Sequence, residues 1–172
     1  MKMKNLVIYY SRSGENYVNG AIKNINKGNT EYVAEFIKKN FDADLFKVET
    51  VKEYAKSYMD CIREAQSELD NNERPELKSY LDDISGYDNI IIAGPCWWGT
   101  YPMAIFSAIE KLDFTGKKVL PIMTHEGSGM GHCEKDLKNT IKGAEFVRGL
   151  AIHGADASSS EKQVVDYLKK NI

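Results

Sequence analysis

Residues 87–102 read YDNIIIAGPCWWGTYP and contain the two features that decide the fold. The apolar run over residues 90–93 is short and continuous, which is typical of a strand buried on both faces. A loop with glycines on either side of two adjacent tryptophans follows the run directly. We therefore expect a strand over residues 87–93 with an aromatic loop at its carboxyl end.

The rest of the chain alternates apolar runs with helical patterns. Short apolar runs predict further strands over residues 6–10, 45–48, 117–124 and 145–152. Helical spacing predicts helices over residues 30–40, 102–112, 131–142 and 160–170, and one near 54–69 within the long connection 49–86. Because parallel neighbours need a crossover connection, this alternation predicts an α/β fold. The expected architecture is a single domain over residues 1–172, a doubly wound sheet of five parallel strands with helices on both faces.

Composition restricts the classes of function. The chain has 172 residues, 42% of them hydrophobic and 28% charged, with a formal net charge of -2. That balance predicts a soluble globular domain and offers no basic surface for nucleic acid. The apolar run after the first residues is too short for a signal-peptide core, no segment approaches membrane-spanning length, and the cysteines lack zinc-site spacing. We expect a cytoplasmic protein without membrane insertion and without a metal site.

The first candidate loop reads Ser11-Arg12-Ser13-Gly14 and follows the first strand, and Gly28-Asn29-Thr30 later opens the first helix. Ligands of a doubly wound sheet bind where its strands end, near the switch in strand order. Hydroxyls and free backbone amides at a helix N-terminus form an anion site. The alternative is that Ser13 or Thr30 simply caps the helix.

The second loop runs over residues 94–102 and contains Trp97 and Trp98. Two adjacent tryptophans do not both face one core comfortably, so at least one is expected near the surface. A flat aromatic ligand would explain the pair, since stacking favours large π faces. A packed aromatic turn or a partner interface is the alternative. Cys96 is expected to be a small buried thiol rather than a redox group.

The third loop, residues 124–131, is rich in glycine and therefore in free backbone amides. By itself it is typical of a mobile surface loop. The three loops together describe a phosphate cradle, an aromatic platform and a glycine-rich flank. That combination predicts a site for a phosphorylated flat heterocycle.

The motifs YYSRSG, GNTEYVAEFI, YDNIIIAGPCWWGTYP and the block ending in THEGSGMG resemble the flavodoxins, especially the bacterial flavodoxin-like branch with a Pro-x-Trp-Trp-Gly loop. The resemblance covers nearly the whole chain and implies FMN as cofactor. It implies that Ser11, Ser13, Asn29 and Thr30 hold the phosphate, and that loops 95–99 and 125–129 flank the isoalloxazine ring. The full set of implied FMN-binding residues is Ser11, Arg12, Ser13, Gly14, Asn29, Thr30, Pro95, Cys96, Trp97, Trp98, Gly99, Thr124, His125, Glu126, Gly127, Ser128 and Gly129.

One segment departs from the flavodoxin pattern. The family's phosphate motif runs Thr/Ser-x-Thr/Ser-Gly-Asn-Thr without interruption, whereas residues 15–27 here separate Gly14 from Gly28. We assign the last motif positions to Asn29 and Thr30, because GNTEYVAEFI keeps the start of the helix intact. The inserted segment is expected to cover the phosphate or to alter which partner docks.

The resemblance implies an electron-transfer protein, monomeric or homodimeric, that serves redox partner proteins or a small-molecule acceptor. FMN carries the redox chemistry, so no catalytic side chain is expected. Backbone groups around Trp98 and Gly99 would bond the ring edge, and Glu126 would oppose an anionic reduced flavin. The alternative on the same fold is an NAD(P)H-dependent quinone or nitro-compound reductase, and a third hypothesis is a flavin-free interaction module.

Overall fold

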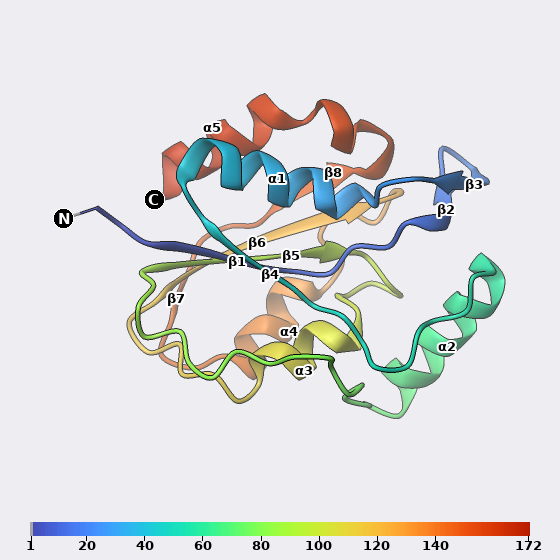
Figure 1. Cartoon of the computed structure of the whole chain (residues 1–172), viewed down its shortest axis with the longest axis horizontal. Coiled ribbons are helices and arrows are strands. Elements are labelled where there is room, and N and C mark those ends of the chain that lie inside the picture. Colours follow the sequence, from blue (N-terminus) through green and yellow to red (C-terminus); the bar gives the residue numbers. More distant parts are fainter. Residues whose placement is uncertain (1) are drawn as a thin grey trace.

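The computed structural model describes residues 2–172 and has a parallel sheet at its centre (Figure 1). The strands lie in the order β4-β1-β5-β6-β7, and β8 also pairs with β6. Every pairing in this sheet is parallel. The bounds are β1 Asn5–Tyr9, β4 Asp44–Lys47, β5 Asn89–Pro95, β6 Lys118–His125, β7 Glu145–Phe146 and β8 Leu150–His153. The predicted doubly wound parallel sheet is confirmed, with the switch in strand order between β1 and β5.

The fifth predicted strand, residues 145–152, is interrupted. β7 pairs with the start of β6, β8 pairs with its end, and residues 147–149 connect them. Gly149 lies against the Met130 side chain and the Pro121 carbonyl so closely that a Cβ atom there would overlap the methionine. The prediction of one continuous strand was therefore wrong at its middle, because the chain takes four residues from 146 to 150 where β6 takes three from 119 to 122, and the extra residue breaks the ladder.

Helices cover both faces of the sheet (Figure 1). α1 (Asn29–Phe41) and α5 (Glu161–Asn171) lie on one face, and α3 (Met103–Ile109) and α4 (Cys133–Thr140) lie on the other. A 3-10 segment, η1 (Gly154–Ser159), precedes α5. Alternate strand residues divide between the two cores: Leu6 and Ile8 pack towards α3, and Val7 packs towards α1 and α5. Burial on both faces explains why the strands read as continuous apolar runs. None of the described helices is long and apolar enough to cross a membrane.

Residues 15–27 form most of an antiparallel hairpin outside the main sheet. Its strands are β2 (Gly14–Val18) and β3 (Ala21–Ile25). The turn residues Asn19 and Gly20 both have positive φ, 50° and 86°, as the tight hairpin turns that favour Asn-Gly require. The hairpin projects beyond the carboxyl ends of β1 and β5, on the same side as α2 (Figure 1).

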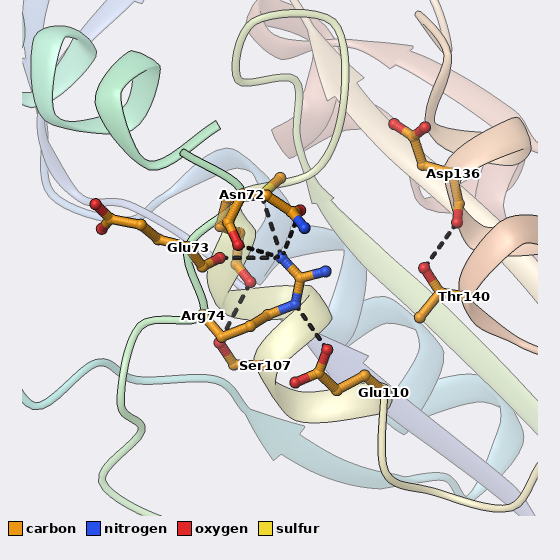
Figure 2. Close-up of polar contacts among 8 residues, drawn as sticks. Asn72, Glu73, Arg74, Ser107, Glu110, Asp136 and Thr140 are labelled. Carbon is orange, nitrogen blue, oxygen red and sulfur yellow. Dashed lines mark hydrogen bonds and ion pairs between the residues drawn. The ribbon is translucent and has the colours of Figure 1, made fainter. Parts of the chain in front are cut away.

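The connection 49–86 contains α2 (Tyr58–Asp70), close to the predicted 54–69. Arg74, which follows α2, links the connection to the end of α3, because its guanidinium Nε donates to Glu110 Oε2 at 2.8 Å (Figure 2). Its Nη1 donates to the neighbouring Glu73 carbonyl at 3.0 Å. An isolated bridge between Thr50 and Leu77 closes the base of the connection. α2 is thereby held beside the carboxyl end of the sheet.

Candidate functional site

A cavity of about 380 Å³ opens at the carboxyl end of the sheet, and we call it the site cavity. Its walls come from the loops after β5 and β6, the start of α1, the hairpin and α2. This is the edge of the sheet where the strand order switches and where a ligand was expected. Of the predicted site residues, those that line it are Arg12, Asn29, Pro95, Cys96, Trp97, Trp98, Thr124, His125, Glu126, Gly127 and Ser128.

A second hollow of about 640 Å³, the side cavity, lies beyond Arg12. Ser11, Ser13 and Gly14 line the side cavity and not the site cavity. Arg12 lines both, and its guanidinium is fixed by carbonyl acceptors: Nε donates to Glu15 at 3.0 Å, and Nη2 donates to Ala55 at 2.9 Å. The predicted phosphate loop is therefore divided between two hollows, with Arg12 at their boundary.

The start of α1 packs tightly against the first loop. Ser11 Oγ accepts the Glu31 backbone N–H at 3.0 Å, so this hydroxyl caps α1 from a distant part of the chain. Thr30 Oγ1 and Thr124 Oγ1 lie 3.0 Å apart in the buried interior. A Cβ atom at Gly28 would overlap Ser11 Oγ and the Arg12 carbonyl, so this close approach requires glycine. Among the four residues expected at the phosphate, Asn29 is the one that lines the site cavity.

The aromatic loop is a two-residue turn. Trp97 N donates to the Thr100 carbonyl at 2.8 Å, and Trp98 and Gly99 have φ values of 57° and 86°. Trp97 packs edge-on against Tyr10 and Tyr54, with ring centroids 5.1 and 5.0 Å apart. Trp98 is 45% exposed, and its indole N–H donates to the Ile62 carbonyl of α2 at 2.8 Å. One tryptophan joins the core and the other stays at the surface, as the sequence indicated. Gly99 does not line the site cavity.

The third loop contributes a carboxylate with one unpaired oxygen. Glu126 Oε2 accepts the Asn19 N–H at 3.0 Å and lies 3.3 Å from His153 Nε2. Glu126 Oε1 is buried and has no partner among the described residues. A Cβ atom on Gly154 would lie 2.6 Å from both this oxygen and Asn29 Nδ2, so the glycine leaves open the space where these groups converge. Gly129 lies in the same loop but outside the site cavity.

The imidazole of His125 lies at the opening of the third loop. Its Nδ1 accepts the Gly127 N–H at 2.9 Å, which requires an unprotonated nitrogen. Burial, and then the neighbouring His153, lower the pKa of His125. The neutral ring therefore holds the loop in shape at neutral pH.

Two walls of the site cavity come from segments in which the sequence predicted no individual site residue. α2 contributes Tyr58, Cys61, Ile62 and Ala65, which recur on one helical face, and the hairpin contributes Asn16 and Tyr17. The Tyr17 and Tyr58 rings stack with centroids 6.1 Å apart and planes 24° apart. Burial raises the pKa of the Cys61 thiol to about 11, so this sulfur is protonated at neutral pH. The Asn19-Gly20 pair is a sequence signal that could have identified this hairpin.

The lining of the site cavity therefore divides into an aromatic and apolar wall and a polar one. α2, Tyr17 and the tryptophans form the first wall, and Asn29 and residues 124–128 form the second. Flat heterocycles favour the first kind of surface, and hydroxyls or phosphates favour the second.

Comparisons with known proteins identify the family and the fold. A family model described as Flavodoxin matches residues 4–171. A solved structure from Bacteroides uniformis, described as a flavoprotein, is 26% identical, with a TM-score of 0.75, 98% of this chain and 99% of that chain covered. A flavoprotein from Lactobacillus acidophilus in complex with FMN is 21% identical, with a TM-score of 0.63 and coverages of 91% and 97%. An apo NADH:FMN oxidoreductase shares the fold at 12% identity, with a TM-score of 0.52 and coverages of 99% and 90%. No curated protein matches the chain in sequence.

Proposed function

The chain belongs to the flavodoxin family, whose cofactor is FMN, and from that premise we propose that it holds FMN in the site cavity and transfers electrons through it. The observation that carries the proposal is the cavity itself: the predicted aromatic loop, the glycine-rich loop and Asn29 converge on one hollow at the end of β5 and β6. The FMN bound to the Lactobacillus acidophilus protein of the same fold supports it.

The polar wall suits the phosphate and the sugar-like chain of FMN. Because Ser11 accepts the Glu31 N–H, the amides that the start of α1 offers to an anion are those of Asn29 and Thr30, where the helix dipole favours negative charge. Glu126 Oε1 is an acceptor without a donor, so it fits a ribityl hydroxyl or a ring N–H rather than a phosphate. We therefore assign the phosphate to the start of α1 and a hydrogen-bond donor of FMN to Glu126.

The aromatic wall suits the isoalloxazine ring. Trp98 is exposed at the cavity and is held at both its backbone turn and its indole nitrogen, so it offers a rigid face for stacking. Bound FMN supplies the redox chemistry. The chain orients the ring, excludes water with Trp97 and α2, and disfavours added negative charge through burial and Glu126.

A reductase is the second candidate, because one observation favours it. Tyr17 and Tyr58 extend the aromatic wall beyond the two tryptophans, which offers a surface to a second flat molecule beside the flavin. The NADH:FMN oxidoreductase of the same fold is in line with this reading. The carrier remains the primary proposal, since it needs only the cofactor and an exposed ring edge.

The visible absorbance of the purified protein, recorded before and after FMN addition, tests the binding proposal. We expect flavin bands that remain with the protein through gel filtration, and a colourless protein that does not retain added FMN would overturn it. Anaerobic mixing with NADH or NADPH separates the two candidates. Slow bleaching with fast electron exchange to a redox partner supports the carrier, and rapid bleaching with quinone turnover supports the reductase.

A further inference from the structure

The turn that carries Trp98 has an uncommon backbone. Trp98 and Gly99 both lie in the left-handed region, with φ values of 57° and 86°. Bulky side chains rarely adopt that region, and residues that do so tend to be held by their surroundings at functional sites. The contacts that hold this turn come from the amino end of α4, which lies outside the site cavity.

Three hydrogen bonds join the turn to α4. The backbone N–H of His132 donates to the Gly99 carbonyl at 2.7 Å. Thr100 Oγ1 donates to Asp136 Oδ2 at 2.6 Å, and His132 Nδ1 lies 2.7 Å from the same oxygen. One carboxylate oxygen thus links the residue after the turn to the residue that caps the helix.

The backbone of the turn and the backbone of residues 131 and 132 are closely packed. A Cβ atom on Gly131 would overlap the Gly99 carbonyl, and a Cβ atom on Gly99 would lie 2.9 Å from His132 Nε2. Asp136 also accepts the Thr140 hydroxyl at its backbone carbonyl, at 2.9 Å (Figure 2), and its Oδ2 atom faces the turn. The turn is therefore fixed from the rear, while its front, with Trp98, lines the cavity.

We propose that Asp136 and His132 are positioning residues that hold the Trp98–Gly99 turn against the flavin ring edge and thereby set the gap between the midpoint potentials of the first and second electron. This rests on the proposed FMN site. Backbone dipoles beside a ring stabilise one charge state over another only while their orientation is held. When the link through Asp136 is lost, the turn samples several orientations, and the preference between charge states weakens.

The test uses the full-length protein and three variants. Asp136→Ala removes the shared acceptor, Asp136→Asn keeps one side-chain oxygen, and Glu134→Ala is the matched control, since it removes a charge from the same first turn of α4 without touching residues 97–100. Thr100→Val removes the hydroxyl and keeps the shape of the side chain. It tests the same link from its other end if Asp136→Ala fails to fold. The readouts are FMN affinity and the two midpoint potentials from a spectroelectrochemical titration.

We expect Asp136→Ala and Thr100→Val to narrow the potential gap by the equivalent of about a tenfold loss in its equilibrium constant, or about 59 mV for one electron. FMN affinity is expected to change less than threefold, Asp136→Asn to recover most of the gap, and Glu134→Ala to match the wild type. If both variants bind FMN with the wild-type gap, or if Glu134→Ala narrows it equally, the positioning role is overturned while the FMN proposal stands. A wild-type protein that binds no FMN overturns both.

Discussion

The Trp98–Gly99 turn and the 14–25 hairpin face the same cavity but are built in opposite ways. The turn lies between the half-buried Trp97, α2 and the amino end of α4, with backbone and side-chain hydrogen bonds on each side. The hairpin has no core of its own, and the residues of β3 are mostly exposed. The difference indicates that one wall is rigid, whereas the other is a cover held by few contacts.

The hairpin rests on few contacts, and most are polar. Glu15 Oε2 accepts the Tyr58 N–H at 2.6 Å, the Asn19 N–H reaches Glu126, and Tyr17 stacks on Tyr58. Single polar contacts contribute about 0.5–1.5 kcal/mol each to stability, so we expect this region to open at a low free energy. The insertion that interrupts the phosphate motif is thus a loosely held cover over the cavity and not one of its rigid walls.

The largest effect is expected where the rigid wall meets α4. Gly131→Ala would place a Cβ atom on the Gly99 carbonyl at a φ of 53°, and we expect it to lower the free energy of unfolding by about 3–4 kcal/mol. Gly116→Ala is the control, since Gly116 has a φ of 76° but nothing within 4 Å of a Cβ atom. It should cost only the backbone term of about 1–2 kcal/mol. Urea unfolding measures both, and equal losses would show that the turn is not tightly seated.

The next effect concerns the exposed tryptophan. Trp98→Ala removes a stacking face worth about 0.5–1.5 kcal/mol, so the Kd for FMN should rise by about two- to twelvefold with little change in Tm. Trp98→Phe separates two causes, because it keeps an aromatic face and loses the bond to Ile62. Fluorescence titration of FMN gives both values. An unchanged Kd in Trp98→Ala would place the ring away from this wall.

Removal of the hairpin is expected to have a smaller effect. Deletion of residues 15–28 joins Gly14 to Asn29 and restores the uninterrupted motif SRSGNT. Gly14 pairs with Ile25, and the Arg12 backbone lies against Gly28, so the ends to be joined are near each other. Loss of the Asn19–Glu126 bond, about 0.5–1 kcal/mol, should speed FMN release about threefold. Stopped-flow displacement measures it, and loss of FMN binding altogether would show that the hairpin is an essential wall.

The smallest effect is a pH dependence in the loop on which the hairpin rests. The pKa of His125 is lowered in the folded protein, so the unfolded chain takes up the proton first as pH falls. The contribution of His125 to the free energy of unfolding is therefore fully present above the ordinary histidine pKa of 6.5 and is lost as pH falls below that value. His125→Asn should flatten the slope of Tm between about pH 7.5 and pH 5.5. Identical slopes in variant and wild type would contradict this assignment.

Much of the site could be predicted because its position follows from the order of local patterns. The run at 90–93 predicted β5, and the loops after β5 and β6 necessarily meet at one edge of a parallel sheet. The same reasoning failed at residues 147–149, where one extra residue relative to β6 interrupts the last strand. It also could not show that Ser11 caps α1 and lines the side cavity.

The sequence by itself determined the parallel α/β architecture, the three loops at the strand ends and the family, because apolar periodicity and turn chemistry are properties of neighbouring residues. Only the tertiary structure decided that α2 and the hairpin form walls of the cavity, and that Asp136 joins Thr100 to His132. These contacts link segments far apart in the chain. Their geometry depends on how whole elements pack, which no local pattern records.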